Sequence, residues 1–162
     1  MEPRKLPQTV PAEELINLLP HKGKMFLLDH LIQHDIIERT LESVSLVTKD
    51  HIFYDESVDG IPSHVAFELI AQSISALSGV TGCERGEPPK PGFLLSLQNY
   101  QAHVASFKVG TSIHVAIKKI DELDNMMTYS GVAYSSENPD VPAVEVVITV
   151  METTDLRILG EK

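Results

Sequence analysis

The chain has 162 residues, of which 43% are hydrophobic and 22% are charged, a composition typical of one globular domain with its own core. Its formal net charge of -10 argues against non-specific binding to nucleic acid and against electrostatic attraction to anionic lipid. The single cysteine, Cys83, excludes an intrachain disulfide, and the first ten residues lack the apolar stretch of a signal peptide, so we expect a cytoplasmic protein.

The first third of the chain is expected to contain one short helix and two strands. Pro3 and Pro7 stand in an N-terminal segment with little apolar content, so we expect a flexible arm there. Acidic residues follow Pro11, as in the first turn of a helix, and Pro20 would end that helix. In order, we predict the arm, the helix, two strands that form a hairpin, and an acidic loop, over residues 1–10, 11–19, 25–32, 37–48 and 49–62.

The stretch from Ser63 to Val80 is predicted to be the central helix, with Ser63 as its N-cap. Apolar residues cover every side of it, and such a helix is either buried on all sides or spans a membrane. Glu68, Gln72 and four serines interrupt the apolar run, which favours a buried core helix. Glu68 is its single formal charge, and a buried carboxylate needs a partner, a cavity or a chemical role.

The remainder of the chain is predicted to be mainly strands. A loop rich in proline and glycine, CERGEPPKPG, separates the helix from them. Strands on both sides of one buried helix indicate an α+β fold, in which an antiparallel sheet wraps around the helix. We expect a single domain over residues 11–155. Its last four strands and the tail that follows are predicted over residues 92–105, 111–121, 126–136, 141–153 and 156–162.

Three motifs follow one another along the chain. They are Leu19-Pro20-His21-Lys22 with Met25-Phe26-Leu27-Leu28-Asp29, then Gly60-Ile61-Pro62 with Glu68-Leu69-Ile70-Ala71-Gln72, then Gly92-Phe93-Leu94-Leu95. In these motifs the chain resembles the hot-dog fold 3-hydroxyacyl-acyl-carrier-protein dehydratases, and it looks closest to the dehydratase-like proteins found with aryl polyene biosynthesis. The resemblance implies a hot-dog fold, in which an antiparallel sheet wraps around a long central helix.

The resemblance also implies an acid on the central helix and a histidine on the loop before it. The E..AQ motif carries the acid over to Glu68. At the distance where the family has the GHFP motif, this chain has Tyr54, so the nearest counterpart of the family histidine is His51, in a longer loop. His64 lies one helical turn before Glu68 and is an alternative base. His21 is expected to hold the N-terminal turn through hydrogen bonds.

Dehydration of a 3-hydroxyacyl thioester needs a base, an acid and donors to the thioester oxygen. Histidine suits the role of base because it titrates near neutral pH. Backbone N–H groups of Ser63 and His64 at the helix start are expected to polarise the carbonyl, and Phe67, Leu94 and Leu95 are expected to line the acyl chain. The sequence contains no phosphate loop, zinc pattern or EF-hand motif, so we expect neither a metal nor a cofactor.

The expected function is conversion of a 3-hydroxyacyl thioester to the 2-enoyl thioester in fatty-acid or polyene-type biosynthesis, with the acyl group on acyl carrier protein or coenzyme A. The resemblance implies a hot-dog dimer whose histidine and acid come from different subunits, either a homodimer or a heterodimer with another hot-dog protein. Two alternatives stay open: a thioesterase in which Glu68 activates water or attacks the carbonyl, and a non-catalytic subunit that pairs with an active partner. Carrier protein is acidic, so its docking is expected to draw on Arg85, Lys90, Lys108, Lys118 or Lys119.

Overall fold

The computed structural model describes residues 2–88 and 92–152 of the chain. Seven strands form one antiparallel sheet in the order β1-β2-β3-β7-β8-β9-β5, and β4 and β6 form a separate two-stranded sheet. The elements in chain order are β1 (Val10–Pro11), α1 (Ala12–Leu15), the 3-10 turns η1 (Ile16–Leu18) and η2 (Gly23–Met25), β2 (His30–Asp35), β3 (Thr40–Leu46), β4 (Gly60–Pro62), α2 (Val65–Arg85), β5 (Gly92–Ala102), β6 (Ser106–Lys108), β7 (Ser112–Leu123), β8 (Met126–Ser135) and β9 (Pro142–Glu152).

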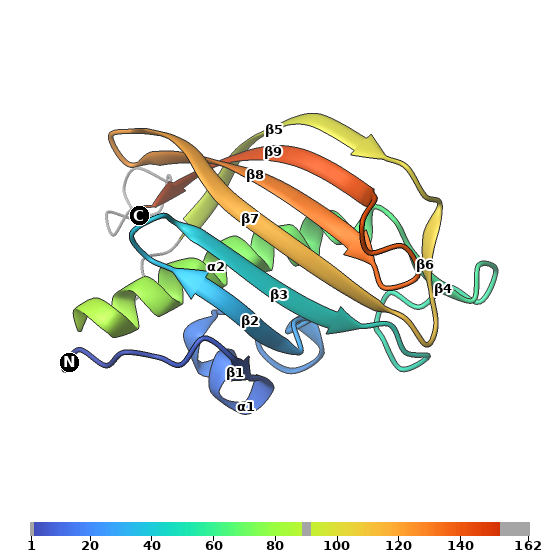
Figure 1. Cartoon of the computed structure of the whole chain (residues 1–162), viewed down its shortest axis with the longest axis horizontal. Helices are drawn as coiled ribbons and strands as arrows, with labels where there is room; N and C mark the ends of the chain where they lie inside the picture. The colour runs from blue at the N-terminus through green and yellow to red at the C-terminus, as the bar shows by residue number, and fades with distance from the viewer. Residues whose placement is uncertain (1, 89–91, 153–162) are drawn as a thin grey trace, which may run out of the picture.

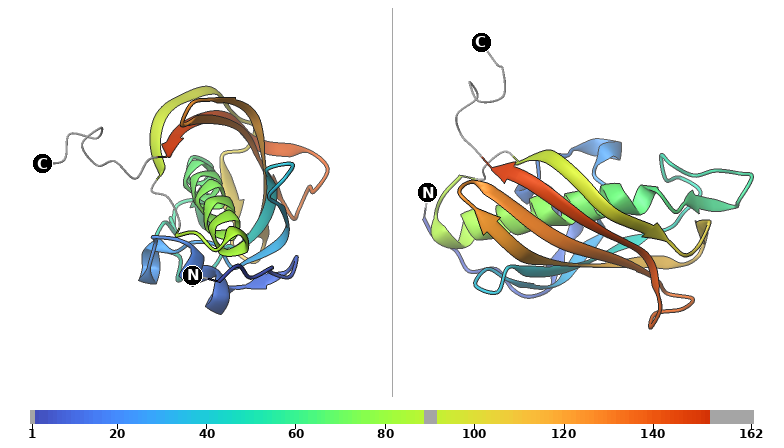
Figure 2. Two further views of the ribbon diagram at one scale, coloured as in Figure 1. Left: turned by 90° about the vertical axis from the view of Figure 1, so that its left-hand side faces the viewer. Right: turned by 90° about the horizontal axis from the view of Figure 1, so that it is seen from above.

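The large sheet wraps around α2. Figure 1 shows the helix lying across one face of the sheet, and the end-on view in Figure 2 shows the strands curving around it. Along β7 the side chains alternate, and Ile113, Val115 and Ile117 are buried on the face that packs against the helix. The predicted α+β architecture, a hot-dog sheet around one long helix, is therefore confirmed.

α2 is buried along most of its circumference. Fourteen of its 21 residues are buried, and their side chains form much of the core. The helix begins at Val65 with His64 as its N-cap, so the predicted cap at Ser63 is wrong. It ends at Arg85, where Gly86 adopts a left-handed conformation and its N–H bonds the Cys83 carbonyl. Among the described helices only α2 has the length and composition of a membrane span, and 72% of that apolar window is buried, as in a core helix.

The N-terminal segment packs on the domain instead of forming the flexible arm predicted over residues 1–10. Leu6 and Val10 are buried in the core, and the Arg4 N–H donates to the Cys83 carbonyl at 2.9 Å. Two apolar side chains suffice to hold the segment, because burying each one is worth about 1.5–3 kcal/mol. The tail predicted over residues 156–162 lies outside the described residues.

The apolar run predicted as a strand over residues 25–32 takes a different form. It begins with η2, and the extended strand β2 starts only at His30. The backbone groups of Met25 and Leu27 bond the side chain of Gln72 on α2 instead of a neighbouring strand. A contact over 45 residues of sequence therefore overrides the local strand pattern.

The acidic loop between β3 and β4 buries one imidazole. His51 Nδ1 accepts a hydrogen bond from the Phe53 N–H at 3.1 Å, while its Nε2 is buried without a hydrogen-bond partner among the described residues. Burial lowers the pKa of His51 below its ordinary value of 6.5, and the nearby carboxylate of Asp29 partly opposes this effect. The imidazole therefore resists protonation in the folded state.

Gly79 marks the closest approach of η1 to the helix. A Cβ built at this position would stand 2.1 Å from the Leu18 carbonyl oxygen. Gly79→Ala should gain up to about 1 kcal/mol of helix propensity and lose about 1–3 kcal/mol through overpacking against backbone. We therefore expect net destabilisation, measured as a lower free energy of unfolding in urea. Gly92→Ala, which meets nothing within 4 Å, is the control, and equal stability of the two variants would contradict this packing.

The buried His51 should make stability depend on pH. Its folded pKa is below its unfolded value, so the unfolded chain binds more protons once the pH falls through 6.5, and the free energy of unfolding decreases. His51→Asn keeps an acceptor for the Phe53 N–H but cannot titrate. The drop in stability between pH 7 and pH 5.5, measured by urea unfolding, should shrink in this variant and persist in a control at the exposed His64, His64→Asn. An unchanged drop in His51→Asn would show that the imidazole titrates normally.

Candidate active site

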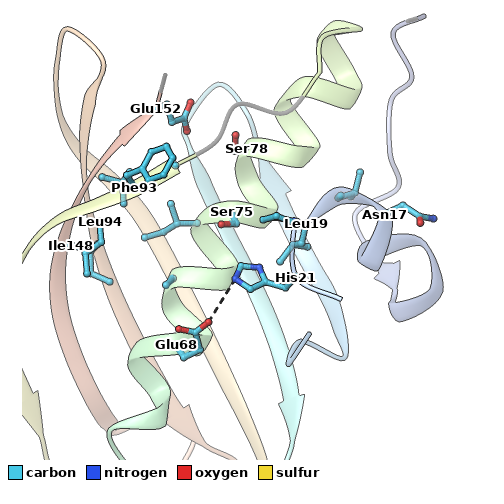
Figure 3. A pocket seen from close by; sticks show the side chains of 16 residues that line it. Asn17, Leu19, His21, Glu68, Ser75, Ser78, Phe93, Leu94, Ile148 and Glu152 are labelled. Atoms are coloured by element: carbon cyan, nitrogen blue, oxygen red, sulfur yellow. Dashed lines mark ion pairs between the residues drawn. The ribbon is translucent and has the colours of Figure 1, made fainter. Parts of the chain in front are cut away.

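A cavity of about 540 Å³ lies between α2, the segment around η1, and the strands β5 and β9. Figure 3 shows Glu68 and His21 toward one end of it and Ser78 and Glu152 toward the other. The lining residues are Asn17, Leu18, Leu19, Pro20, His21, Glu68, Ala71, Ile74, Ser75, Ser78, Gly92, Phe93, Leu94, Ile148, Val150 and Glu152.

The floor of the cavity is one stripe of α2. Glu68, Ala71, Ser75 and Ser78 follow one another at spacings of three and four residues, so they share one face of the helix. Three of the four side chains are small, which leaves space above the helix along about 15 Å of its length. The facing walls are mostly apolar, so the cavity suits a ligand with a long apolar part.

Glu68 faces an imidazole at one end of this floor. His21 Nε2 lies 3.7 Å from Glu68 Oε1, and both side chains keep about a quarter to a third of their surface exposed (26% and 32%). The other ring nitrogen of His21, Nδ1, is buried and has no hydrogen-bond partner among the described residues. The cavity therefore presents one carboxyl group and one imidazole nitrogen side by side, which are the two groups that acid–base chemistry requires.

Gln72 fixes the position of Glu68 and of the chain near His21. Its side chain is fully buried, and its Oε1 accepts a hydrogen bond from the Leu27 N–H at 2.9 Å. Its Nε2 donates to the Met25 carbonyl at 2.7 Å and to Glu68 Oε1 at 3.2 Å. One amide thus ties the loop after His21 to the helix and holds the carboxyl oxygen that faces the imidazole.

Lys22 fixes the other side of the same loop. Its Nζ donates to the carbonyl of Leu19, the residue after η1, at 2.8 Å, and to the carbonyl of Ile16, the first residue of η1. Leu19 itself is buried in the core, so the backbone just before His21 has little freedom. The hydrogen bonds of Lys22 and Gln72 therefore anchor the backbone around His21 and hold its imidazole in place.

The structure places both predicted bases, His51 and His64, away from this cavity within the chain. His51 lines a separate cavity of about 380 Å³ with Asp29 and Leu46, and no residue lines both cavities. His64 is exposed ahead of α2 and does not line the cavity that holds Glu68. Of the three predicted acid–base residues, Glu68, His51 and His64, only Glu68 therefore lines the cavity of about 540 Å³ in its own chain.

The remaining predicted site residues are divided. Leu94 lines the cavity with Glu68, whereas Phe67 packs against the core and Leu95 is exposed elsewhere on β5. The Ser63 N–H donates to the Ala105 carbonyl at 3.0 Å, so it is not free to bind a thioester oxygen, and that prediction is corrected here. This hydrogen bond connects the start of α2 to the residue before β6.

The basic residues predicted for docking do not form one patch. Arg85 ends α2, and Lys108 lies on β6 beside its beginning, about 30 Å away along the helix. Lys108 Nζ donates to the Val58 carbonyl, and Lys119 forms an ion pair with Glu122 at 3.0 Å. Lys90 lies outside the described residues.

Sequence reasoning missed the catalytic potential of His21. Its contact with Glu68 spans 47 residues, which no spacing rule reveals. The sequence offered one signal: His21 and Glu68 each belong to a motif that carries the family resemblance, which is consistent with a shared site. Among the described residues no group of three or more His, Cys, Asp or Glu side chains is placed to hold a metal ion.

Comparison with solved structures shows the same fold in dehydratases and thioesterases. The dehydratase heterocomplex ApeI:P from Xenorhabdus doucetiae matches with a TM-score of 0.79 at 21% identity, over 91% of this chain and 97% of that one. A hypothetical thioesterase with coenzyme A from Streptococcus pneumoniae matches with a TM-score of 0.58 at 9% identity, over 76% and 84% of the two chains. The PaaI protein of E. coli matches with a TM-score of 0.57 at 8% identity, over 75% and 80%.

Comparison with protein families gives the identity that these distant structural matches leave open. The search of curated proteins found no match. The family model described as ApeP dehydratase matches residues 13–159, which include His21, Glu68, Gln72 and the strands around the cavity. The chain therefore belongs to the ApeP-like dehydratase family.

Proposed function

We propose that this protein dehydrates a 3-hydroxyacyl thioester to the 2-enoyl thioester. The observation that carries the proposal is the carboxyl group of Glu68 facing an imidazole nitrogen at 3.7 Å at one end of a largely apolar cavity. The family supports dehydration in general, and the cavity supports a substrate with an acyl chain. Its volume of about 540 Å³ lies within the usual range of small-molecule sites, roughly 300–1,000 Å³.

The reaction breaks two bonds on neighbouring carbons. An imidazole removes the proton from the carbon next to the thioester, where the carbonyl stabilises the developing negative charge. The electron pair forms the double bond and expels the hydroxyl from the next carbon, and Glu68 gives that hydroxyl the proton with which it leaves as water. The acid and the base are each worth roughly 10²–10⁴-fold in rate.

The shape of the cavity supports a placement for the rest of the substrate. The acyl chain would lie along the α2 stripe of Ala71, Ser75 and Ser78, against Leu94 and Ile148. The thioester would sit near Glu68, with acyl carrier protein or coenzyme A beyond the mouth of the cavity. The His64 N–H stays a predicted donor to the thioester oxygen.

We also propose that a second hot-dog chain pairs with β5. This strand is the long edge of the sheet, bonded only to β9 among the described strands, whereas the opposite edge, β1, has two residues. An edge with open N–H and C=O groups is a template for another strand. Leu95, Leu97 and Tyr100 are exposed along it, and Leu94 of the same strand lines the cavity, so a partner here would also cover the site.

Glu68→Gln tests the reaction. We expect loss of enoyl thioester formation by roughly 10²–10⁴-fold, because the amide cannot donate a carboxyl proton. Enoyl absorbance and free thiol are followed together on 3-hydroxyacyl thioesters of several lengths. Glu84→Gln, the same charge change on the same helix outside the cavity, is the control and should keep wild-type activity.

The two products separate the proposal from its alternatives. Release of free thiol and acid without enoyl thioester would make the protein a thioesterase. No turnover by the protein alone, with activity restored by a second hot-dog chain whose own acid is intact, would make it a non-catalytic subunit. Full enoyl formation by Glu68→Gln would remove Glu68 from the reaction.

The double substitution Leu95→Lys, Leu97→Lys tests the interface. Charged side chains along an edge strand oppose pairing with another sheet. We expect a homodimer of the 17.9 kDa chain to become a monomer in sedimentation experiments, with loss of activity as the cavity loses its cover. Leu123→Lys, at an exposed leucine near the end of β7, is the control and should leave the dimer intact.

One result would contradict the interface, and another would change the identity of the partner. A double variant that remains a dimer would place the contact elsewhere on the surface. A wild-type chain that is monomeric until a different hot-dog protein is added would replace the homodimer with a heterodimer.

A further inference from the structure

We propose that the base of the reaction is His21 and that the acid and the base come from one and the same chain. This inference rests on the proposed dehydratase function and specifies its site. It replaces His51 as the base and replaces a site divided between subunits with one that each chain assembles alone. The juxtaposition of His21 and Glu68 inside the cavity is the observation that points to it.

The separation of the two groups suits elimination across one carbon–carbon bond. At 3.7 Å the imidazole nitrogen and the carboxyl oxygen are too far apart for a strong hydrogen bond, so neither group is fully occupied by the other. The reacting proton and hydroxyl sit on adjacent carbons, and reacting atoms approach to about 3–3.5 Å. A nitrogen and an oxygen side by side can therefore reach both positions from one face of the substrate.

The ring nitrogens of His21 have distinct roles. Nδ1 is buried, so Nε2, which faces Glu68, is the nitrogen that a substrate can reach. The neutral base then carries its proton on Nδ1. No described residue accepts a hydrogen bond from Nδ1, so the orientation of the ring depends on the backbone anchors through Gln72 and Lys22.

His51 is poorly placed to serve as the base from either chain. Its Nδ1 is occupied by the Phe53 N–H, and its Nε2 is buried within its own chain, beside a cavity separate from that of Glu68. A substrate held beside Glu68 of a partner would have to reach a nitrogen that its own chain already covers. In contrast, His21 Nε2 lies beside Glu68 in the same cavity, where a substrate can reach it.

The pair also explains how the site returns to its starting state. The proposed step uses a neutral His21 and a protonated Glu68; after elimination His21 holds the proton from carbon and Glu68 is ionised. One proton passed from Nε2 to Oε1, over the 3.7 Å between them or through the departing water, restores both groups. The substrate loses one water, and the protein neither gains nor loses a proton over the cycle.

Mixed dimers of differently tagged chains test this arrangement. The first dimer pairs a His21→Ala chain with a Glu68→Gln chain. If each site lies within one chain, neither half is complete, and activity should stay as low as in the single variants, roughly 10²–10⁴-fold down. If the site is shared, one of the two sites regains both groups, and about half of the wild-type activity should return.

The reciprocal dimer shows that mixed dimers fold and work. It pairs a wild-type chain with a chain that carries both His21→Ala and Glu68→Gln. We expect about half of the wild-type activity, because one chain keeps a complete site. Activity near zero here, or recovery in the first dimer, would overturn the single-chain site. His51→Ala in both chains should leave activity unchanged; its loss in a folded His51→Ala dimer, with activity kept in a His21→Ala dimer, would restore His51 as the base.

A spectroscopic measurement tests, without requiring turnover, whether His21 and Glu68 meet within one chain. A chain labelled with ¹⁵N-histidine is paired with an unlabelled chain, and the ring resonances of His21 are recorded. They should move when Glu68→Gln is in the labelled chain and stay when it is in the partner; the opposite result overturns the proposal. If the wild type makes no enoyl thioester from any substrate, the dehydratase function fails, and these resonances still decide where the pair is assembled.

Discussion

The buried amide of Gln72 is the interaction on which the site depends. It satisfies one backbone N–H and one carbonyl of the segment after His21, and the same amide bonds the Glu68 carboxyl group. Leaving a buried polar group unsatisfied costs about 1–3 kcal/mol, so the hydrogen bonds to Gln72 hold this loop against α2. The distance between the imidazole and the carboxyl group is thus set by a structural hydrogen-bond network. The two reactive groups themselves need not attract each other.

The incomplete cover of α2 creates the cavity. The curled sheet and η1 bury most of the helix, but the stripe that contains Ala71, Ser75 and Ser78 faces open space. Large apolar side chains there would fill the space and add stability, since each is worth about 1.5–3 kcal/mol when buried. The small and polar residues therefore indicate a surface kept free for a ligand. The cavity and the exposed edge of β5 share Leu94, so a partner chain on β5, as proposed, would lie beside the cavity.

Local patterns predicted most of the fold because most of its elements depend on local rules. Apolar residues around the whole of α2 required burial on all sides, and alternation in β7 to β9 predicted the strands within a few residues. The predictions failed where a distant partner decides the outcome. Leu6 and Val10 fix an N-terminal segment that its prolines suggested was flexible, and Gln72 turns an apolar run into a bonded loop. β4 and β6 pair over three residues each, which is too short a signal to read.

The same distinction explains why the acid was found and its neighbour was not. Glu68 is conspicuous in sequence because a charge in an apolar helix demands a reason. His21 lies in the turn Pro20-His21-Lys22-Gly23, where a histidine requires no explanation. The structure shows that its motif acts as a clamp: Lys22 holds the loop at η1, Gln72 holds its middle, and Asp29 accepts the Leu46 N–H at 2.5 Å at its end. These three contacts are more than a turn requires, and together they place the imidazole of His21 beside the carboxyl group of Glu68. The two motifs thus form a single structural unit, and His21 and Glu68 lie where they meet.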